Sequence, residues 1–250
     1  GREVRYTTDG SDVIKNGYAS WVYYEEILGR GSNYRSFWWS PDSRYLAFFR
    51  YDDSSVPVYP LYDVRGKHGL QEINRYPRAG DPSPEVSVGI VPVEGGMVVW
   101  AAFDPKDDQY FGTPFWRPDG SSLLVQWMPR EQNVLKLYDI DLITGKKEEI
   151  YNEIQPTWVV WIESLHWVKD GFMMSRDFYG WEQISVHDSD GSLRQKLTSG
   201  RMWDTKIIRV DEKSQQVYFT SKGEISTFFS SRSRHTRLVS DWSSDVCSSD

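Results

Sequence analysis

The sequence predicts an all-β fold, a partial β-propeller of about four blades. Three observations carry this prediction. A strand–turn–strand unit recurs along the chain, and the later copies follow one another at blade-sized intervals. No stretch sustains the 3.6-residue periodicity of an amphipathic helix, so few helices are expected. Because a four-stranded blade is typically about 40–50 residues long, this repeat favours a propeller.

The recurring unit is clearest in residues 37–48 and 115–125, which read FWWSPDSRYLAF and FWRPDGSSLLV. Weaker copies run through residues 165–174 and 207–219. In each unit two apolar segments flank a tight turn. Pro, Asp and Gly have backbone preferences that suit such turns. Each unit is therefore expected to form one hairpin of a blade.

The spacing of the units indicates an insertion after the first one. The turns are 77 residues apart from Pro41 to Pro118, 51 from Pro118 to Lys169, and 42 from Lys169 to Asp211. The first interval is too long for one blade, and the proline-rich segment 54–84 is the expected insertion. A β-sandwich is the alternative fold, although a sandwich would not repeat a turn at blade spacing.

The propeller segment is expected to span residues 1–227. Because each blade buries its faces against its neighbours, an open arc leaves two faces uncovered, and this segment is not expected to be stable by itself. The chain opens on Gly1 in strand-like alternation, so we expect it to be an excised or truncated piece.

Residues 228–250 differ in character from the rest of the chain. They are rich in serine, show almost no apolar periodicity and contain Cys247, the single cysteine. A polar, disordered terminus is one interpretation. The other is a non-native tail, since the segment resembles the translation of sequencing-adapter DNA found on unrelated truncated gene models. Neither His235 nor Cys247 is therefore a catalytic candidate.

Composition limits the class of protein. The chain has 29 Lys and Arg against 36 Asp and Glu, and no basic stripe, so nucleic acid is not an expected partner. Its 12 Trp, 15 Tyr and 11 Phe suit the half-buried surfaces of sheets. No apolar run reaches the roughly 18 residues of a membrane span. A single cysteine cannot form an internal disulfide.

No complete active site can be assigned to the sequence. It contains no Gly-x-Ser-x-Gly nucleophile elbow. No metal or other cofactor is predicted, since the histidines His68, His166 and His187 lack metal-ligand spacing. His166 is interpreted as a core or edge residue of a strand. Two further acidic pairs are interpreted as solvated loop residues, Asp52-Asp53 and Asp107-Asp108.

The pair Glu25-Glu26 is the best candidate for a binding site. It directly follows the aromatic run Trp21-Val22-Tyr23-Tyr24. Neighbouring carboxylates repel each other unless a cation or hydrogen-bond donors compensate. A ligand with a positive charge, such as the free amino group of a peptide, would supply that compensation. The alternative is that both glutamates lie on a solvated loop without a ligand.

Four blocks together resemble the dipeptidyl peptidase IV family, serine exopeptidases of the prolyl oligopeptidase clan. They are Glu25-Glu26, FWWSPD at 37–42, DDSSVP at 52–57 and YPRAG at 76–80. Their order and spacing match the N-terminal propeller of that family, and a weaker similarity extends to about Thr227. The resemblance implies an eight-bladed propeller that caps a C-terminal α/β-hydrolase domain, of which this chain holds about half the blades.

The resemblance also implies a function. Glu25 and Glu26 match the glutamate pair that binds the substrate's N-terminal ammonium, and the aromatic residues before them are given a packing role. The propeller would gate substrates of an enzyme that removes dipeptides after Pro or Ala. The Ser-Asp-His triad would lie in the α/β-hydrolase domain, which is absent here, so this chain has no catalytic residue and is expected to be inactive alone.

Further expectations follow from the resemblance alone. The partners would be peptides with a free N-terminus and the missing hydrolase domain, with a homodimer of the complete protein also implied. Location in the periplasm or cell envelope is implied as well. A related enzyme that releases tripeptides could share the glutamate pair. The alternative from another functional class is a non-enzymatic propeller scaffold that binds a protein or peptide.

Overall fold

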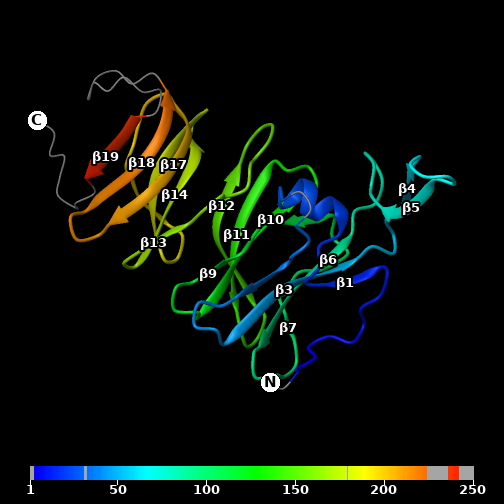
Figure 1. The fold of residues 1–250 in the computed structure, drawn as a ribbon. Coiled ribbons are helices and arrows are strands. Elements are labelled where there is room, and N and C mark those ends of the chain that lie inside the picture. The colour runs from blue at the N-terminus through cyan, green and yellow to red at the C-terminus, as the bar shows by residue number, and fades with distance from the viewer. Residues whose placement is uncertain (1–2, 31–32, 179, 224–235, 242–250) are drawn as a thin grey trace, which may run out of the picture. The chain divides into compact units, whose positions relative to one another are not determined.

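The computed structural model describes residues 3–30, 33–178, 180–223 and 236–241. The chain divides into two compact units, residues 1–161 and residues 162–250. Each unit consists of small antiparallel sheets (Figure 1). In the described part of the chain, no helix is both long and apolar enough to cross a membrane.

The first sheet of unit 1 has the order β1-β3-β6-β7, with β2 also paired to β3. Its strands are β1 (Ile14–Asn16), β2 (Phe37–Trp39), β3 (Tyr45–Asp52), β6 (Glu85–Pro92) and β7 (Val99–Trp100). Strands β1 and β2 pair with opposite ends of β3, since Lys15 lies opposite Tyr51 and Phe37 lies opposite Phe48. The edge of this sheet is therefore one strand split in two by residues 17–36.

The second sheet of unit 1 repeats this plan. Its order is β12-β11-β10-β8, with β9 also paired to β10. Its strands are β8 (Gln109–Phe111), β9 (Phe115–Trp116), β10 (Ser122–Pro129), β11 (Val134–Asp141) and β12 (Lys147–Ile154). Here β8 and β9 form the split edge strand. Both sheets thus have the four-stranded antiparallel layout of a propeller blade.

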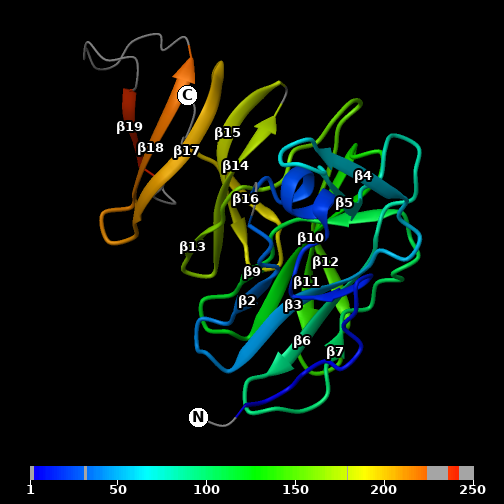
Figure 2. The ribbon, with the colours of Figure 1, turned by 45° about the vertical axis from the view of Figure 1, so that its right-hand side comes forward.

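The expected insertion is confirmed as a separate hairpin. Strands β4 (Val58–Asp63) and β5 (Leu70–Arg75) pair only with each other among the strands described, while β3 pairs directly with β6. The hairpin leaves and returns at one point, because the Tyr76 N–H donates to the Pro57 carbonyl at 3.2 Å. In Figure 1 the hairpin projects to the right of β3 and β6, and in Figure 2 it is turned toward the viewer.

The core of unit 1 lies between its two larger sheets. Phe49 and Tyr51 of β3 are fully buried, as are Leu123 and Val125 of β10, and all four belong to one apolar cluster. Successive side chains of a strand point to opposite faces of its sheet, so residues two apart lie on the same face. These buried residues therefore lie on the faces that the two sheets turn toward each other. The cluster also includes residues of the helical segment that interrupts the first sheet.

The described residues of unit 2 form two sheets. One has the order β13-β14-β15-β16, and the other has the order β17-β18-β19. The strands are β13 (His166–Val168), β14 (Gly171–Phe178), β15 (Trp181–Asp188), β16 (Leu193–Lys196), β17 (Met202–Asp211), β18 (Gln216–Gly223) and β19 (Thr236–Asp241). Met173 and Ile184 of the first sheet share an apolar cluster with Val217 and Phe219 of the second.

The four predicted repeat units each form the first hairpin of a sheet. Their turns join β2 to β3, β9 to β10, β13 to β14, and β17 to β18. In the first turn, the Asp42 carboxylate accepts hydrogen bonds from the Ser40 hydroxyl at 2.6 Å and the Arg44 N–H at 3.1 Å. In the second, Gly120 has the positive φ that its turn requires. The prediction of an all-β chain made of about four blade-like sheets is confirmed.

Most of the segment 228–250 lies outside the described residues. Its residues 236–241 form β19, which pairs antiparallel with β18 from Ser221↔Thr236 to Gln216↔Asp241. The part of the expected disordered tail that the structure describes is therefore a strand. The proposed non-native origin of the segment stays a prediction.

Candidate functional site

The glutamate pair lies on an excursion from the edge of the first sheet. The chain leaves after β1 and returns at β2, and backbone hydrogen bonds close the neck. The Gly17 N–H donates to the Phe49 carbonyl at 2.9 Å, and the Ser36 N–H donates to the Gly17 carbonyl at 2.9 Å. Gly17 has a φ of 66°, which glycine adopts without strain. The excursion therefore begins and ends at the same place on the sheet.

The excursion carries the helical element η1 (Tyr23–Ile27), a short π-helix. The Leu28 N–H donates to the Tyr23 carbonyl at 2.7 Å, which is the i to i−5 bond of this wider helix. Gly29, with a φ of 57°, ends it in the left-handed conformation common after helices. Single π-helical turns are rare and often occur at functional sites.

The two faces of η1 differ sharply. Tyr23, Tyr24 and Ile27 are buried, whereas Glu25 and Glu26 are exposed. Tyr23 is fully buried, and its hydroxyl accepts a hydrogen bond from the Phe111 N–H of β8 at 3.3 Å. One face of the helix therefore packs in the core and is hydrogen-bonded to the second sheet. The other face presents both carboxylates to solvent.

Each carboxylate accepts a hydrogen bond from an aromatic side chain. The Trp21 indole Nε1–H donates to Glu25 Oε2, and the Tyr76 hydroxyl donates to Glu26 Oε1 at 3.1 Å. The two donor rings touch edge to face, with centroids 5.3 Å apart at 68°. Burial raises the pKa of Tyr76, and its hydrogen bond to Glu26 raises it further. Tyr76 therefore keeps its proton near neutral pH.

This contact adds to the sequence interpretation. Tyr23 and Tyr24 pack in the core, as expected for the aromatic residues before the pair. Trp21 is partly buried and also packs against that core, and in addition its indole donates to Glu25. The sequence assigns no role to Tyr76. Its distance of 50 residues from Glu26 hides the contact, and only the return of the β4–β5 hairpin brings it near.

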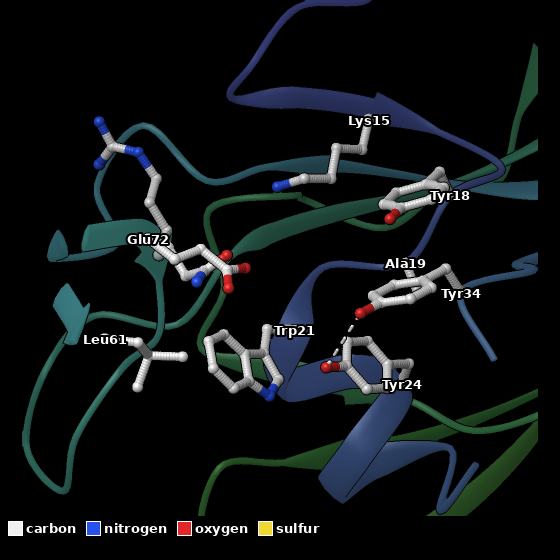
Figure 3. A pocket seen from close by; sticks show the side chains of 10 residues that line it. Lys15, Tyr18, Ala19, Trp21, Tyr24, Tyr34, Leu61 and Glu72 are labelled. Carbon is white, nitrogen blue, oxygen red and sulfur yellow. Dashed lines mark hydrogen bonds between the residues drawn. The ribbon is translucent and has the colours of Figure 1, made fainter. Parts of the chain in front are cut away.

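Trp21 also lines a cavity of about 400 Å³ (Figure 3). Its wall combines aromatic rings, two cations and a carboxylate, and it is lined by Lys15, Tyr18, Ala19, Trp21, Tyr24, Tyr34, Leu61, Glu72, Asn74 and Arg75. Tyr18 and Tyr34 stack with ring centroids 4.8 Å apart, and Tyr34 donates to the Tyr24 hydroxyl at 3.4 Å. The excursion, Lys15 of β1 and the β4–β5 hairpin thus line this space together.

The interpretation of Asp52-Asp53 as solvated loop residues is wrong. Asp52 is partly buried and is the last residue of β3. The side chain of Asp53 is fully buried, and it forms an ion pair with Lys15 of β1. Burial raises the pKa of Asp53, while the hydrogen bond and charge of Lys15 act in the opposite direction. Asp107 and Asp108 are exposed, as expected. A sequence in which two Asp residues are adjacent does not reveal which one faces the core.

His166 and His187 both lie in strands of unit 2. His166 of β13 is half-buried, which confirms its placement in a strand. His187 is almost fully buried, and its Nδ1 lies 2.9 Å from the Gly191 carbonyl and its Nε2 3.0 Å from the Ser185 hydroxyl. Burial lowers the pKa of His187. Among the residues that the structure describes, no group of three or more His, Cys, Asp or Glu is placed to hold a metal.

The glutamate pair can act as an acceptor for a cation. An ionised carboxylate has two oxygens with about four lone-pair sites, so one aromatic donor leaves room for further hydrogen bonds. An ammonium group offers three N–H donors and forms short, strong bonds to carboxylates. Two exposed carboxylates with acceptor capacity to spare are therefore chemically suited to a protonated amine.

Comparison with known proteins agrees with this reading of the fold. Residues 1–235 match the sequence model of the dipeptidyl peptidase IV (DPP IV) N-terminal region. Dipeptidyl peptidase 4 of Arthroderma otae is 29% identical over 257 residues, which cover 96% of this chain and 32% of that protein. Dipeptidyl peptidase 4 of Trichophyton rubrum is 28% identical, with the same coverage.

A solved structure supports the same assignment. The crystal structure of Porphyromonas gingivalis dipeptidyl peptidase 4 superposes with a TM-score of 0.76 at 29% identity, over 89% of this chain and 32% of that one. The chain thus spans about a third of the length of these relatives. Its sheets correspond to the propeller part of such proteins. The chain belongs to the dipeptidyl peptidase IV family of serine peptidases, within the N-terminal region of that family.

Proposed function

We propose that the complete protein is a serine exopeptidase that removes dipeptides, after Pro or Ala, from peptides with a free N-terminus. In this proposal the present chain gates the substrate, and Glu25 and Glu26 bind its terminal ammonium. The observation that carries the proposal is the exposed carboxylate pair on a helix whose opposite face is buried. A buried anchor makes the position of the pair reproducible, which a binding site requires.

The chemistry of the pair supports a role in binding. Two adjacent carboxylates attract a protonated amine and repel anions, so an acetylated N-terminus would lose the interaction. Fixing the terminus at one distance from a nucleophile determines which peptide bond that nucleophile reaches. The Ser-Asp-His triad that the proposal needs belongs to the α/β-hydrolase domain, outside this chain. By itself, this chain is expected to hydrolyse nothing.

The test is a pair of substitutions in the complete protein, Glu25→Gln and Glu26→Gln. Each replaces a charged acceptor by a neutral one of the same shape. We expect kcat/KM for a chromogenic Xaa-Pro substrate to fall about 10- to 100-fold, since hydrogen bonds to charged groups contribute about 1.5–3 kcal/mol. Labelling by a serine-directed phosphonate probe should stay at the wild-type rate, because the probe carries no ammonium.

Glu94→Gln serves as the matched control, since Glu94 is an exposed glutamate of unit 1 outside the site. Normal turnover in both Glu25→Gln and Glu26→Gln would overturn the proposal. Mass spectrometry of products from a longer peptide separates release of dipeptides from release of tripeptides. A complete protein that binds peptides but cleaves none, and that resists the serine probe, would instead be a binding scaffold.

Two further proposals rest on family resemblance and have their own measurements. Export to the periplasm or cell envelope is checked by fractionation of the source cells. Assembly of the complete protein as a homodimer is checked by analytical ultracentrifugation. Neither outcome changes the test of Glu25 and Glu26.

A further inference from the structure

The two carboxylates are held by donors from different parts of the chain. Trp21 lies two residues before the start of η1 and donates to Glu25, four residues further along the chain. Tyr76 follows the inserted β4–β5 hairpin and donates to Glu26 at 3.1 Å. The two rings also contact each other, with centroids 5.3 Å apart. Both glutamates are therefore hydrogen-bonded to one pair of aromatic rings that contact each other, Trp21 and Tyr76.

We propose that Trp21 and Tyr76 are positioning residues, which orient Glu25 and Glu26 for the substrate ammonium. This inference rests on the proposed function and deepens it. It assigns a role to the insertion, because the hairpin delivers the Tyr76 hydroxyl to the site. Trp21 and Tyr76 need not touch the substrate.

Electrostatics explains why such donors are needed. Two adjacent carboxylates repel each other, and exposed glutamate side chains otherwise sample several rotamers. A hydrogen bond to one oxygen of each carboxylate offsets part of the repulsion and selects a rotamer. The second oxygen of each group stays available as an acceptor. Less conformational freedom is then lost when the ammonium binds, and this preorganisation strengthens binding.

The position of Tyr76 is itself determined by its surroundings. Its N–H donates to the Pro57 carbonyl at 3.2 Å, which closes the base of the hairpin. Its ring contacts Tyr59 of β4 edge to face, with centroids 6.3 Å apart, in addition to its contact with Trp21. The backbone of Tyr76 is fixed by this hydrogen bond and its ring by these aromatic contacts. The Tyr76 hydroxyl therefore has a defined position next to Glu26. Loss of that hydroxyl alone leaves these packing contacts in place.

The experiment uses Tyr76→Phe and Trp21→Phe in the complete protein, with steady-state kinetics on a free-amino Xaa-Pro substrate. Tyr76→Phe should raise KM about 3- to 15-fold and change kcat less than about 2-fold, since one hydrogen bond of the binding site is lost. Trp21→Phe should act in the same direction. Tyr62→Phe is the matched control, because it removes a hydroxyl from the same hairpin on a ring that is 72% exposed.

A double-mutant cycle shows whether Tyr76 acts through Glu26. If it does, adding Tyr76→Phe to Glu26→Gln should raise KM by less than about 2-fold, because the orienting bond has no charged partner left. Full additivity would overturn the positioning role, as would a KM of Tyr76→Phe equal to that of Tyr62→Phe. A general structural defect would also lower kcat and slow the serine-directed probe, and that result would overturn the proposal too.

These outcomes separate the two claims. If Glu25→Gln and Glu26→Gln lose activity while Tyr76→Phe and Trp21→Phe match the wild type, the binding role stands and the positioning role fails. If the glutamate variants turn over normally, the proposed function itself fails.

Discussion

The Tyr23 hydroxyl accepts a hydrogen bond from the Phe111 N–H, 88 residues further along the chain. Tyr23 is the residue of η1 that reaches deepest into the core, and its ring also contacts Tyr51 of β3 with centroids 4.8 Å apart. One side chain therefore joins η1 to both of the larger sheets of unit 1. The position of the exposed glutamates depends on this buried contact.

Substitution of Tyr23 should separate the hydrogen bond from the packing. Tyr23→Phe leaves the buried Phe111 N–H without its acceptor and should cost about 1–3 kcal/mol of unfolding free energy. Tyr23→Ala also leaves a cavity and should cost about 3–5 kcal/mol. Denaturant unfolding of the complete protein, followed by tryptophan fluorescence, measures both. Equal losses in the two variants would show that the ring contributes nothing beyond its hydroxyl.

Removing one partner of the Lys15–Asp53 ion pair should lower the free energy of unfolding more than replacing both partners by apolar residues. Asp53→Ala leaves the partly buried Lys15 ammonium without its carboxylate and should destabilise by about 3 kcal/mol. The double variant Lys15→Met with Asp53→Leu removes both charges and should recover most of that loss. The same unfolding experiment compares them. A double variant as unstable as Asp53→Ala would contradict the electrostatic explanation.

Replacing Gly17, at the neck of the excursion, by a residue with a side chain should lower the stability of the protein. Its φ of 66° places a residue with a Cβ in the left-handed region, at a cost of about 1–2 kcal/mol. Gly17→Ala should lower stability by that amount. Gly10→Ala is the control, because an added Cβ there meets nothing within 4 Å. A loss in Gly10→Ala equal to that in Gly17→Ala would rule out the conformational cause.

The buried histidine should make stability depend on pH. Burial holds the pKa of folded His187 below its ordinary 6.5, so the unfolded chain takes up the proton first as pH falls. Its contribution to stability is complete above about pH 6.5 and is lost as pH falls toward the folded pKa. His187→Gln should flatten the pH dependence between pH 7 and 5. His166, whose pKa burial also lowers, should account for part of the slope that remains.

His68→Gln is the matched control for this measurement, because His68 is exposed. Unfolding of each variant at several pH values between 5 and 7 gives the slopes. A slope unchanged by His187→Gln would show that groups other than this imidazole produce the acid sensitivity.

Local patterns were enough to predict the sheets and their turns. The SPDS and PDGS turns form where they were expected because Asp side chains bind their own backbone two residues on, as Asp42 and Asp119 do. Such contacts depend on neighbours in sequence. The insertion was also readable, since its prolines and length break the repeat.

Contacts between distant residues were not predictable in this way. The burial of Asp53 depends on Lys15, and the hydrogen bond to Glu26 depends on Tyr76, at separations of 38 and 50 residues. The π-helix under the glutamates was missed for a related reason. It is only five residues long, and tertiary packing of Tyr23, Tyr24 and Ile27 stabilises it more than any helical propensity.

The closed neck between Gly17 and Ser36 has a consequence for how this region can change over evolutionary time. Because the chain leaves and rejoins the sheet at one point, insertions or deletions inside the excursion leave the pairing of β3 untouched. The length and sequence of the excursion can then change while the blade beneath it keeps its strand pairing. The excursion and the sheet can therefore evolve separately, although they belong to one continuous stretch of chain.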